Sequence, residues 1–316
     1  MAFNKKDAAK NDLNTVPWLT KARPYLIMAP SLLITIGILV PFAMAIYYSF
    51  TSYTFKLPTF KFVGLKNWLN MFKDPAFWHA IWVTIRYAFF ATIVEMGLGL
   101  GIALLLGNTE NKFTKFLRVV LTFPLMVAPA IATIIWQLMT NNSVGILEKF
   151  LNIFGIYNFP WAASHTTAMF TAVLIDTWVY CPFVIILILA GIQSLPKSPF
   201  ESAKIDGGSA WFNFRNLTLP MIKPCIYIAL LFRLMASLQE FSIIFALTKG
   251  GPGDTLMNLS VTAYNTGFAF QKFAASLPII LVLWVIVNLT AKQIVKKWQY
   301  SQKVASGRDA AEGGKS

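Results

Sequence analysis

The chain has 316 residues, of which 56% are hydrophobic and only 13% are charged. A soluble globular domain carries about 25% charged residues, so this composition excludes a soluble protein and indicates a membrane protein. The formal net charge of +14 has two interpretations, nucleic-acid binding or membrane topology, and the positions of the basic residues separate them.

Six apolar segments are each near or above the ~20 residues that a helix needs to cross the hydrocarbon core, which predicts an all-α membrane protein with six transmembrane helices. The predicted spans are 25–50, 81–107, 117–140, 166–192, 222–247 and 274–295. The first apolar run is too long for the core of a cleaved signal peptide. Two connecting segments, 51–80 and 141–164, are expected to form short amphipathic caps on the outer face. Neither is long enough for a domain that captures a solute.

Basic residues concentrate on one side of the predicted membrane. Most of the 27 Lys and Arg residues lie in the N-terminal tail 1–24, the 108–118 loop, the 193–223 loop and the C-terminal tail 296–316. The positive-inside rule therefore predicts that both termini and the 193–223 loop are cytoplasmic. The tails lack a dense basic run interleaved with aromatic residues, so nucleic-acid binding is not expected. The Gly-, Ala- and charge-rich segment 305–316 predicts partial disorder.

Catalytic and metal-binding patterns are absent from the sequence. Cys181 and Cys225 lie inside apolar segments, where we expect them to pack as small core residues. His79 and His165 lie at predicted membrane boundaries and are expected to act as polar anchors. No phosphate-binding loop occurs. The glycines of 97–101 lie inside the second predicted span and indicate close helix packing.

A polar segment at 193–220 separates the fourth and fifth predicted spans. Ser198 is a plausible N-cap, and Pro199 suits the first helical position. Glu201 then falls in the first turn, where its charge suits the helix dipole. Gly207-Gly208 should end this helix, and an aromatic amphipathic helix should follow along the membrane before Pro220. Two interpretations remain open, an exposed docking element or an ordinary interfacial connector.

Ionisable residues inside the membrane are costly and are functional candidates by default. The five candidates are Arg86, Glu95, Asp176, Arg233 and Glu240. Two sets have the i, i+4, i+7 spacing of a single helix face. These sets are Asp176, Tyr180 and Phe183 on the fourth span, and Arg233, Ser237 and Glu240 on the fifth. Such faces suit a sugar, but a buried Asp–Arg–Glu network that fixes helix packing is an equal alternative.

Three segments resemble motifs of the carbohydrate-type ABC importer permeases, the maltose and glycerol-3-phosphate group. The first runs from ESAKIDGG at 201–208 to Leu219-Pro220. The second contains Asp176-Thr177-Trp178, Pro182-Phe183 and GIQSLP at 191–196. The third is LTKGGP at 247–252, followed by YNTGF at 264–268. Ser202 and Gly208 depart from the family pattern, which usually has Ala at the first position and often has Ala at the second.

This resemblance implies a type I ABC importer permease fold, in which 25–295 is the permease domain and 193–220 is its coupling loop. The residues implied to dock on an ATPase subunit are Glu201, Ser202, Ala203, Asp206, Gly207 and Gly208. ATP and Mg would be bound by that partner, and this chain would bind no cofactor or metal and would carry no catalytic residue.

The resemblance also implies partners and a pathway. The partners would be a second homologous permease, an ATPase dimer, an extracellular or periplasmic solute-binding protein and membrane lipid, in a bacterial or archaeal plasma membrane. The residues implied to line the pathway for a sugar, an oligosaccharide, a polyol or an acidic sugar are Asp176, Tyr180, Phe183, Arg233, Ala236, Ser237 and Glu240. Arg86 and Glu95 would contact other helices or the partner permease.

Two other functional classes are weighed against this interpretation. An ion-coupled secondary transporter would need internal repeats and broken-helix ion sites, and the sequence has no internal repeat. A membrane-embedded enzyme would need an acid/base pair or a metal set at a membrane face. Only the importer requires a docking loop at 201–220.

Overall fold

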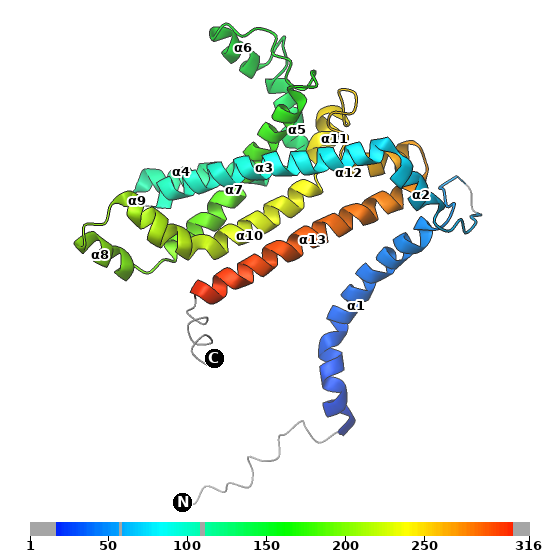
Figure 1. Cartoon of the computed structure of the whole chain (residues 1–316), viewed down its shortest axis with the longest axis horizontal. Coiled ribbons are helices and arrows are strands. Elements are labelled where there is room, and N and C mark those ends of the chain that lie inside the picture. The colour runs from blue at the N-terminus through cyan, green and yellow to red at the C-terminus, as the bar shows by residue number, and fades with distance from the viewer. Residues whose placement is uncertain (1–16, 57–58, 108–110, 306–316) are drawn as a thin grey trace, which may run out of the picture.

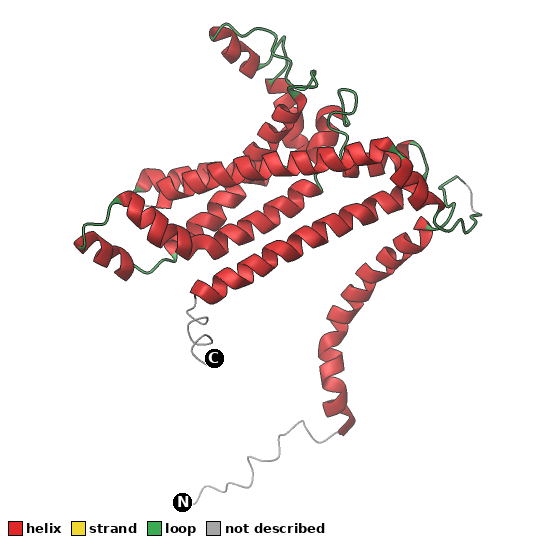
Figure 2. Ribbon diagram, viewed as in Figure 1, coloured by secondary structure: helices red, strands yellow, loops and turns green. Residues whose placement is uncertain are grey.

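The computed structural model describes residues 17–56, 59–107 and 111–305. This part of the chain is built from helices joined by short loops, with one isolated antiparallel bridge between Thr51 and Phe62 (Figure 2). The helices are α1 (Pro17–Ser49), α2 (Lys66–Lys73), α3 (Pro75–Gly107), α4 (Lys112–Thr122), α5 (Pro129–Met139), α6 (Ile146–Ile153), α7 (Ala168–Gln193), α8 (Ser198–Ile205), α9 (Ala210–Asn213), α10 (Leu219–Leu238), α11 (Ser242–Thr248), α12 (Leu259–Tyr264) and α13 (Phe273–Ala305). A 3₁₀ turn, η1 (Phe123–Met126), and two π segments, η2 (Phe214–Thr218) and η3 (Asn265–Ala269), connect some of them.

Four long helices, α3, α7, α10 and α13, lie roughly side by side and form the body of the molecule (Figure 1). Small residues allow the helices to approach closely. A Cβ on Gly99 would lie 2.5 Å from a methyl of Val184 on α7, and a Cβ on Gly191 would lie 2.7 Å from the sulfur of Cys225 on α10. Of the three glycines in 97–101, only Gly99 has such a contact, so the predicted small-residue packing is confirmed at that position alone.

Helix α1 stands apart from this body over much of its length (Figure 1). It packs against α13, but none of the apolar window within Ile27–Ser49 is buried in the chain. An apolar helix with so little cover within its own chain has its surface available to lipid or to another protein.

Among the described residues, five helices are long and apolar enough to cross a membrane, or six if one bent pair counts as a single span. The bent pair corresponds to the predicted third span. Its two parts, Lys112–Met126 and Pro129–Met139, are bent by 100° relative to each other. Proline lacks an N–H and disfavours helical geometry in the preceding residue. Pro124 and Pro129 flank the break, and Val127 between them is extended. The predicted span 117–140 is therefore a bent pair of helices and not one straight helix.

The fifth span also differs from its prediction of 222–247. Helix α10 ends at Leu238, and α11 begins as a separate short helix at Ser242. At its other end the helical run continues back through η2 and α9 to Ala210. Pro220 cannot donate a hydrogen bond to the preceding turn, and the chain accommodates it with the π segment rather than with a new helix start. The predicted separate amphipathic helix before Pro220 is thus the first part of the span itself.

The predicted tails are partly helical. Helix α1 begins at Pro17 and α13 continues to Ala305, so each predicted tail, 1–24 and 296–316, contains helical residues. The predicted disordered segment lies almost entirely in 306–316, outside the described residues, as do residues 1–16. Of the predicted outer caps, 51–80 contains the amphipathic α2, and 141–164 contains the amphipathic α6.

Both histidines of the chain contact one turn on the predicted outer side. His79 Nε2 lies 3.0 Å from the carbonyl oxygen of Asp254, and His165 Nδ1 lies 2.5 Å from the hydroxyl of Thr255. Through these contacts the two histidines attach α3 and the segment before α7 to the connection between α11 and α12.

Candidate functional site

The predicted docking element is an exposed helix at one end of the molecule. Helix α8 buries none of its residues and projects beyond the ends of α7 and α10 (Figure 1). Glu201, Ser202, Asp206 and Gly207 are exposed, whereas Ala203 and Gly208 are half-buried. Pro199 lies in the first turn as predicted, but the residue at the N-cap position is Lys197 and not Ser198, and no side chain caps the helix.

The two glycines end α8 by backbone geometry. Gly207 has a φ of +75°, a left-handed conformation that glycine adopts without steric cost and that commonly ends helices. The Gly208 N–H then donates to the Ala203 carbonyl at 2.7 Å. A Cβ on Gly208 would lie 2.8 Å from that same oxygen, so this turn is fitted to glycine where the family often has Ala. The predicted helix break at this pair is confirmed.

An apolar side chain that the sequence analysis did not select completes the exposed surface. Ile205 is 86% exposed at the end of α8, beside the charged Glu201 and Asp206. The Ile205 side chain is therefore available for contact with another protein. It is one of several apolar residues in the segment 193–220, so no signal in the sequence distinguished it.

The second candidate region is a buried charge cluster at the crossing of α3, α7 and α10. Arg233 on α10 donates from Nε to Glu95 Oε2 at 2.5 Å and from Nη2 to Glu95 Oε1 at 2.7 Å. Its Nη2 also donates to Asp176 Oδ2 at 3.1 Å and to Ser237 Oγ at 3.2 Å. Glu95 and Asp176 are fully buried, and Arg233 is 2% exposed.

An aromatic ring closes one side of this cluster. The guanidinium carbon of Arg233 lies 4.1 Å from the ring centroid of Tyr180, a cation–π geometry. The other carboxylate oxygen of Asp176 is buried and has no partner among the described residues. In this conformation the Arg233 guanidinium therefore contacts three polar side chains and the Tyr180 ring.

The structure brings together part of the predicted pathway set. Asp176, Tyr180, Arg233 and Ser237 meet as described, and Glu95 joins them from α3. The predicted contact of Glu95 with another helix is confirmed by its bidentate pair with Arg233 of α10. The same expectation for Arg86 has no bond to support it, because its buried Nε has no partner among the described residues.

The remaining members of the predicted pathway set make other contacts. Glu240 follows the end of α10, so the expectation that it continues the helix face of Arg233 is wrong. Its carboxylate accepts the Ile243 N–H at 2.8 Å and so caps the first turn of α11. Phe183 is half-buried against the exposed Phe232 ring, with centroids 6.0 Å apart, and Ala236 is exposed.

The two candidate regions are mechanically connected. Helix α8 lies between α7, which carries Asp176, and the continuous run 210–238, which carries Arg233. Only short turns join α8 to these helices. The ring centroids of Trp211 and Phe214, at the start of the run 210–238, lie 5.5 Å apart. Two of the three helices that hold the charge cluster are therefore joined to α8 through short turns.

Comparison with known proteins agrees with this architecture. Residues 99–299 match the family described as "binding-protein-dependent transport system inner membrane component". The chain is 37% identical over 258 residues to a probable ABC transporter permease of Sinorhizobium fredii, with 81% of each chain covered. It is 35% identical over 242 residues to the trehalose/maltose transport system permease of Thermococcus litoralis, with 76% of this chain and 82% of that protein covered.

The fold is also found among solved structures. A chain of a bacterial alginate ABC transporter, solved with a periplasmic protein bound to an alginate pentasaccharide, superimposes with a TM-score of 0.77 at 18% identity. The alignment covers 88% of this chain and 94% of that chain. The family match covers well over half of the sequence, so this chain belongs to the membrane-embedded components of binding-protein-dependent transport systems, and the predicted ABC importer permease fold is confirmed.

Proposed function

We propose that this chain is one permease subunit of an ATP-driven importer that moves a carbohydrate into the cytoplasm by alternating access. The observation that carries the proposal is the exposed helix α8, held between two helices that share a buried ion cluster. Such a helix has no fully buried residue in its own chain and would gain stability from a partner that covers it. The importer would lie in a bacterial or archaeal plasma membrane with both chain termini in the cytoplasm, as the basic residues predict.

The docking surface consists of Glu201, Ser202, Ala203, Asp206, Gly207 and Gly208, to which the structure adds Ile205. In the proposed complex these residues occupy a groove on one subunit of an ATPase dimer, and the apolar Ile205 provides the desolvated centre of the contact. The partner would bind ATP and Mg, and this chain would supply the mechanical connection. Two packed arrangements of α7 and α10 are the two-state element that such a connection requires.

A carbohydrate is the solute class that the relatives support. One relative is a trehalose/maltose permease and one structural neighbour is an alginate transporter, so we infer a sugar, an oligosaccharide or a related polyol or acidic sugar. A solute-binding protein outside the membrane and a second homologous permease complete the proposed assembly. Of the predicted pathway residues, Tyr180 and Phe183 are half-buried and Ala236 is exposed. Asp176, Arg233 and Ser237 are buried.

The test is a charge reversal on α8. Glu201→Arg is expected to abolish solute uptake and its coupling to ATP hydrolysis while the chain still inserts in the membrane, because the exposed carboxylate makes no contact that folding requires. Uptake by vesicles and ATPase activity would be measured on the complex purified with its partners. Lys115→Glu on α4 is the control, because it reverses an exposed charge on the same predicted side away from α8.

Either of two results would oppose the proposal. Wild-type uptake by Glu201→Arg would remove the coupling role of α8. Uptake by the chain alone, driven by an ion gradient without an ATPase, would favour the ion-coupled secondary transporter.

A further inference from the structure

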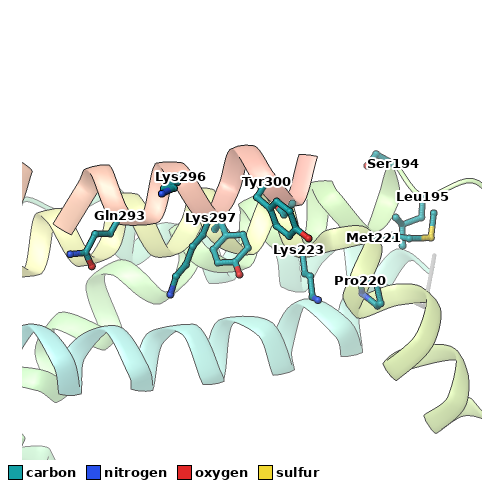
Figure 3. Close-up of a pocket in the computed structure, with 11 residues that line it drawn as sticks. Ser194, Leu195, Pro220, Met221, Lys223, Gln293, Lys296, Lys297 and Tyr300 are labelled. Carbon is teal, nitrogen blue, oxygen red and sulfur yellow. The ribbon is translucent and has the colours of Figure 1, made fainter. Parts of the chain in front are cut away.

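A large cavity lies between α10 and α13 at the end of the molecule where α8 projects. Its volume is about 1110 Å³, and it reaches the end of α7 at Ser194 and Leu195. Both stems of the α8 loop border it, because Pro220 and Met221 at the start of α10 also line the cavity (Figure 3). None of the pathway residues lines it.

The lining of this cavity is cationic. Lys223 from α10 and Lys296 and Lys297 from α13 line it, and no acidic residue does. None of the three lysines forms an ion pair within the described part of the chain. Figure 3 shows the Lys223 and Lys297 side chains extending to the same side of the cavity. Tyr227, Gln293 and Tyr300 add polar groups. An anionic group would therefore find several donors and no repelling charge.

The surface beside these donors is apolar. On α13, one helix face carries Lys297 and Gln293 and continues at the same four-residue spacing as Leu289 and Val285. Leu289 is 57% exposed and Val285 is 44% exposed. This face runs from the lysines towards the middle of the span. Leu195, Pro220 and Met221 line the opposite part of the cavity. The site thus has cationic hydrogen-bond donors at one end of an exposed apolar helix face.

We propose that this cavity binds the headgroup of an anionic phospholipid of the inner leaflet, with an acyl chain along the α13 face. The basic residues predict that this end of the molecule faces the cytoplasm, and basic pockets between transmembrane helices at that level recognise acidic headgroups. A free phosphate would use the lysines and leave the apolar face uncovered. A zwitterionic lipid would bring a cationic group beside its phosphate, into a lining that has three lysines and no acidic residue to pair with it.

Bound lipid would bridge α7, α10 and α13 next to α8. The cavity contacts Ser194 and Leu195, which follow α7 and begin the link to α8, and Pro220 and Met221, which lie within the helical run 210–238 that follows α8. An occupied site would therefore restrict how these two segments separate. This regulatory consequence rests on the proposed function of α8, whereas the binding site itself does not.

The binding test uses the full chain in mixed phosphatidylcholine and phosphatidylglycerol nanodiscs, followed by native mass spectrometry of retained lipid. Wild type is expected to retain phosphatidylglycerol over phosphatidylcholine by at least about tenfold, because each lysine near the surface adds to attraction for acidic lipid. The variant Lys223→Gln/Lys296→Gln/Lys297→Gln should lose this preference. The control Lys112→Gln/Lys115→Gln/Lys292→Gln should keep it, because it removes the same charge outside the cavity, partly from the same helix.

The outcomes separate the sources of the anion. Full displacement of phosphatidylglycerol by inorganic phosphate would overturn the lipid site in favour of a free phosphate site. Equal retention by the cavity variant and wild type would overturn it in favour of a nonspecific charge effect. A thermal unfolding midpoint of the cavity variant in pure phosphatidylcholine equal to that of wild type would show that lost retention reflects binding and not misfolding. Because no ATPase is present, failure of this test leaves the proposed function of α8 unaffected.

Discussion

At the scale of single residues, the buried cluster around Arg233 explains how three helices stay together inside a membrane. The guanidinium forms a bidentate pair with Glu95 and also binds Asp176 and Ser237. Removing one partner from a buried ion pair leaves an uncompensated charge, which costs far more than replacing the whole set with neutral groups.

Arg233→Met is therefore expected to lower the free energy of unfolding by about 3–5 kcal/mol, measured by thermal or denaturant unfolding in detergent. Adding Glu95→Gln and Asp176→Asn should recover much of this loss, because the buried carboxylates are then neutral. Arg86→Met is the matched control, since it removes an arginine for which no ion pair is found in the described residues. Equal losses for the two single variants would contradict a special role for the cluster.

At the scale of elements, the breaks in the spans decide which side chains meet. Pro124 and Pro129 bend the third span, and the interruption after Leu238 moves Glu240 from the face of Arg233 to the start of α11. The residue thereby becomes a helix cap, and its relation to the solute pathway depends on the position of α11.

Two substitutions distinguish a cap from a pathway residue at Glu240. Glu240→Ala removes the acceptor for the Ile243 N–H and should lower the free energy of unfolding by about 1 kcal/mol. Glu240→Gln keeps an acceptor oxygen and should stay close to wild type in both stability and solute preference. A changed uptake profile in Glu240→Gln, with unchanged stability, would instead support a direct contact with the solute.

At the scale of the whole molecule, all proposed functions depend on which side of the membrane α8 faces. The basic residues predict that α8 and both termini are cytoplasmic and that α2, α6 and the turn at 250–255 are outside. In a background with Cys181→Ala and Cys225→Ala, an impermeant maleimide should label Ser202→Cys only in inside-out vesicles. Asn142→Cys, exposed between α5 and α6, should be labelled only in right-side-out vesicles. The reverse pattern would invalidate both the docking and the lipid proposals.

The family could be predicted from local sequence, because its features are local. The apolar runs reach membrane-spanning length, and the segment at 201–208 combines an early acid with a glycine break that the structure reproduces. The candidate site was predicted less completely. Asp176, Arg233 and Ser237 were selected by helical spacing, but spacing within one helix carries no information about Glu95, which lies 138 positions from Arg233.

The sequence alone determined the membrane class and the family motifs, and it predicts the span number, the sidedness and the docking role of 201–208, because all of these depend on neighbouring residues. Hydrophobic length and charge bias act along the chain, so a single sequence contains them. Only the tertiary structure decided that Arg233 pairs with Glu95, that Glu240 caps α11, and that three lysines from α10 and α13 line one cavity. These results depend on how proline breaks and close glycine contacts set the relative positions of helices, and those positions are a property of the packed whole.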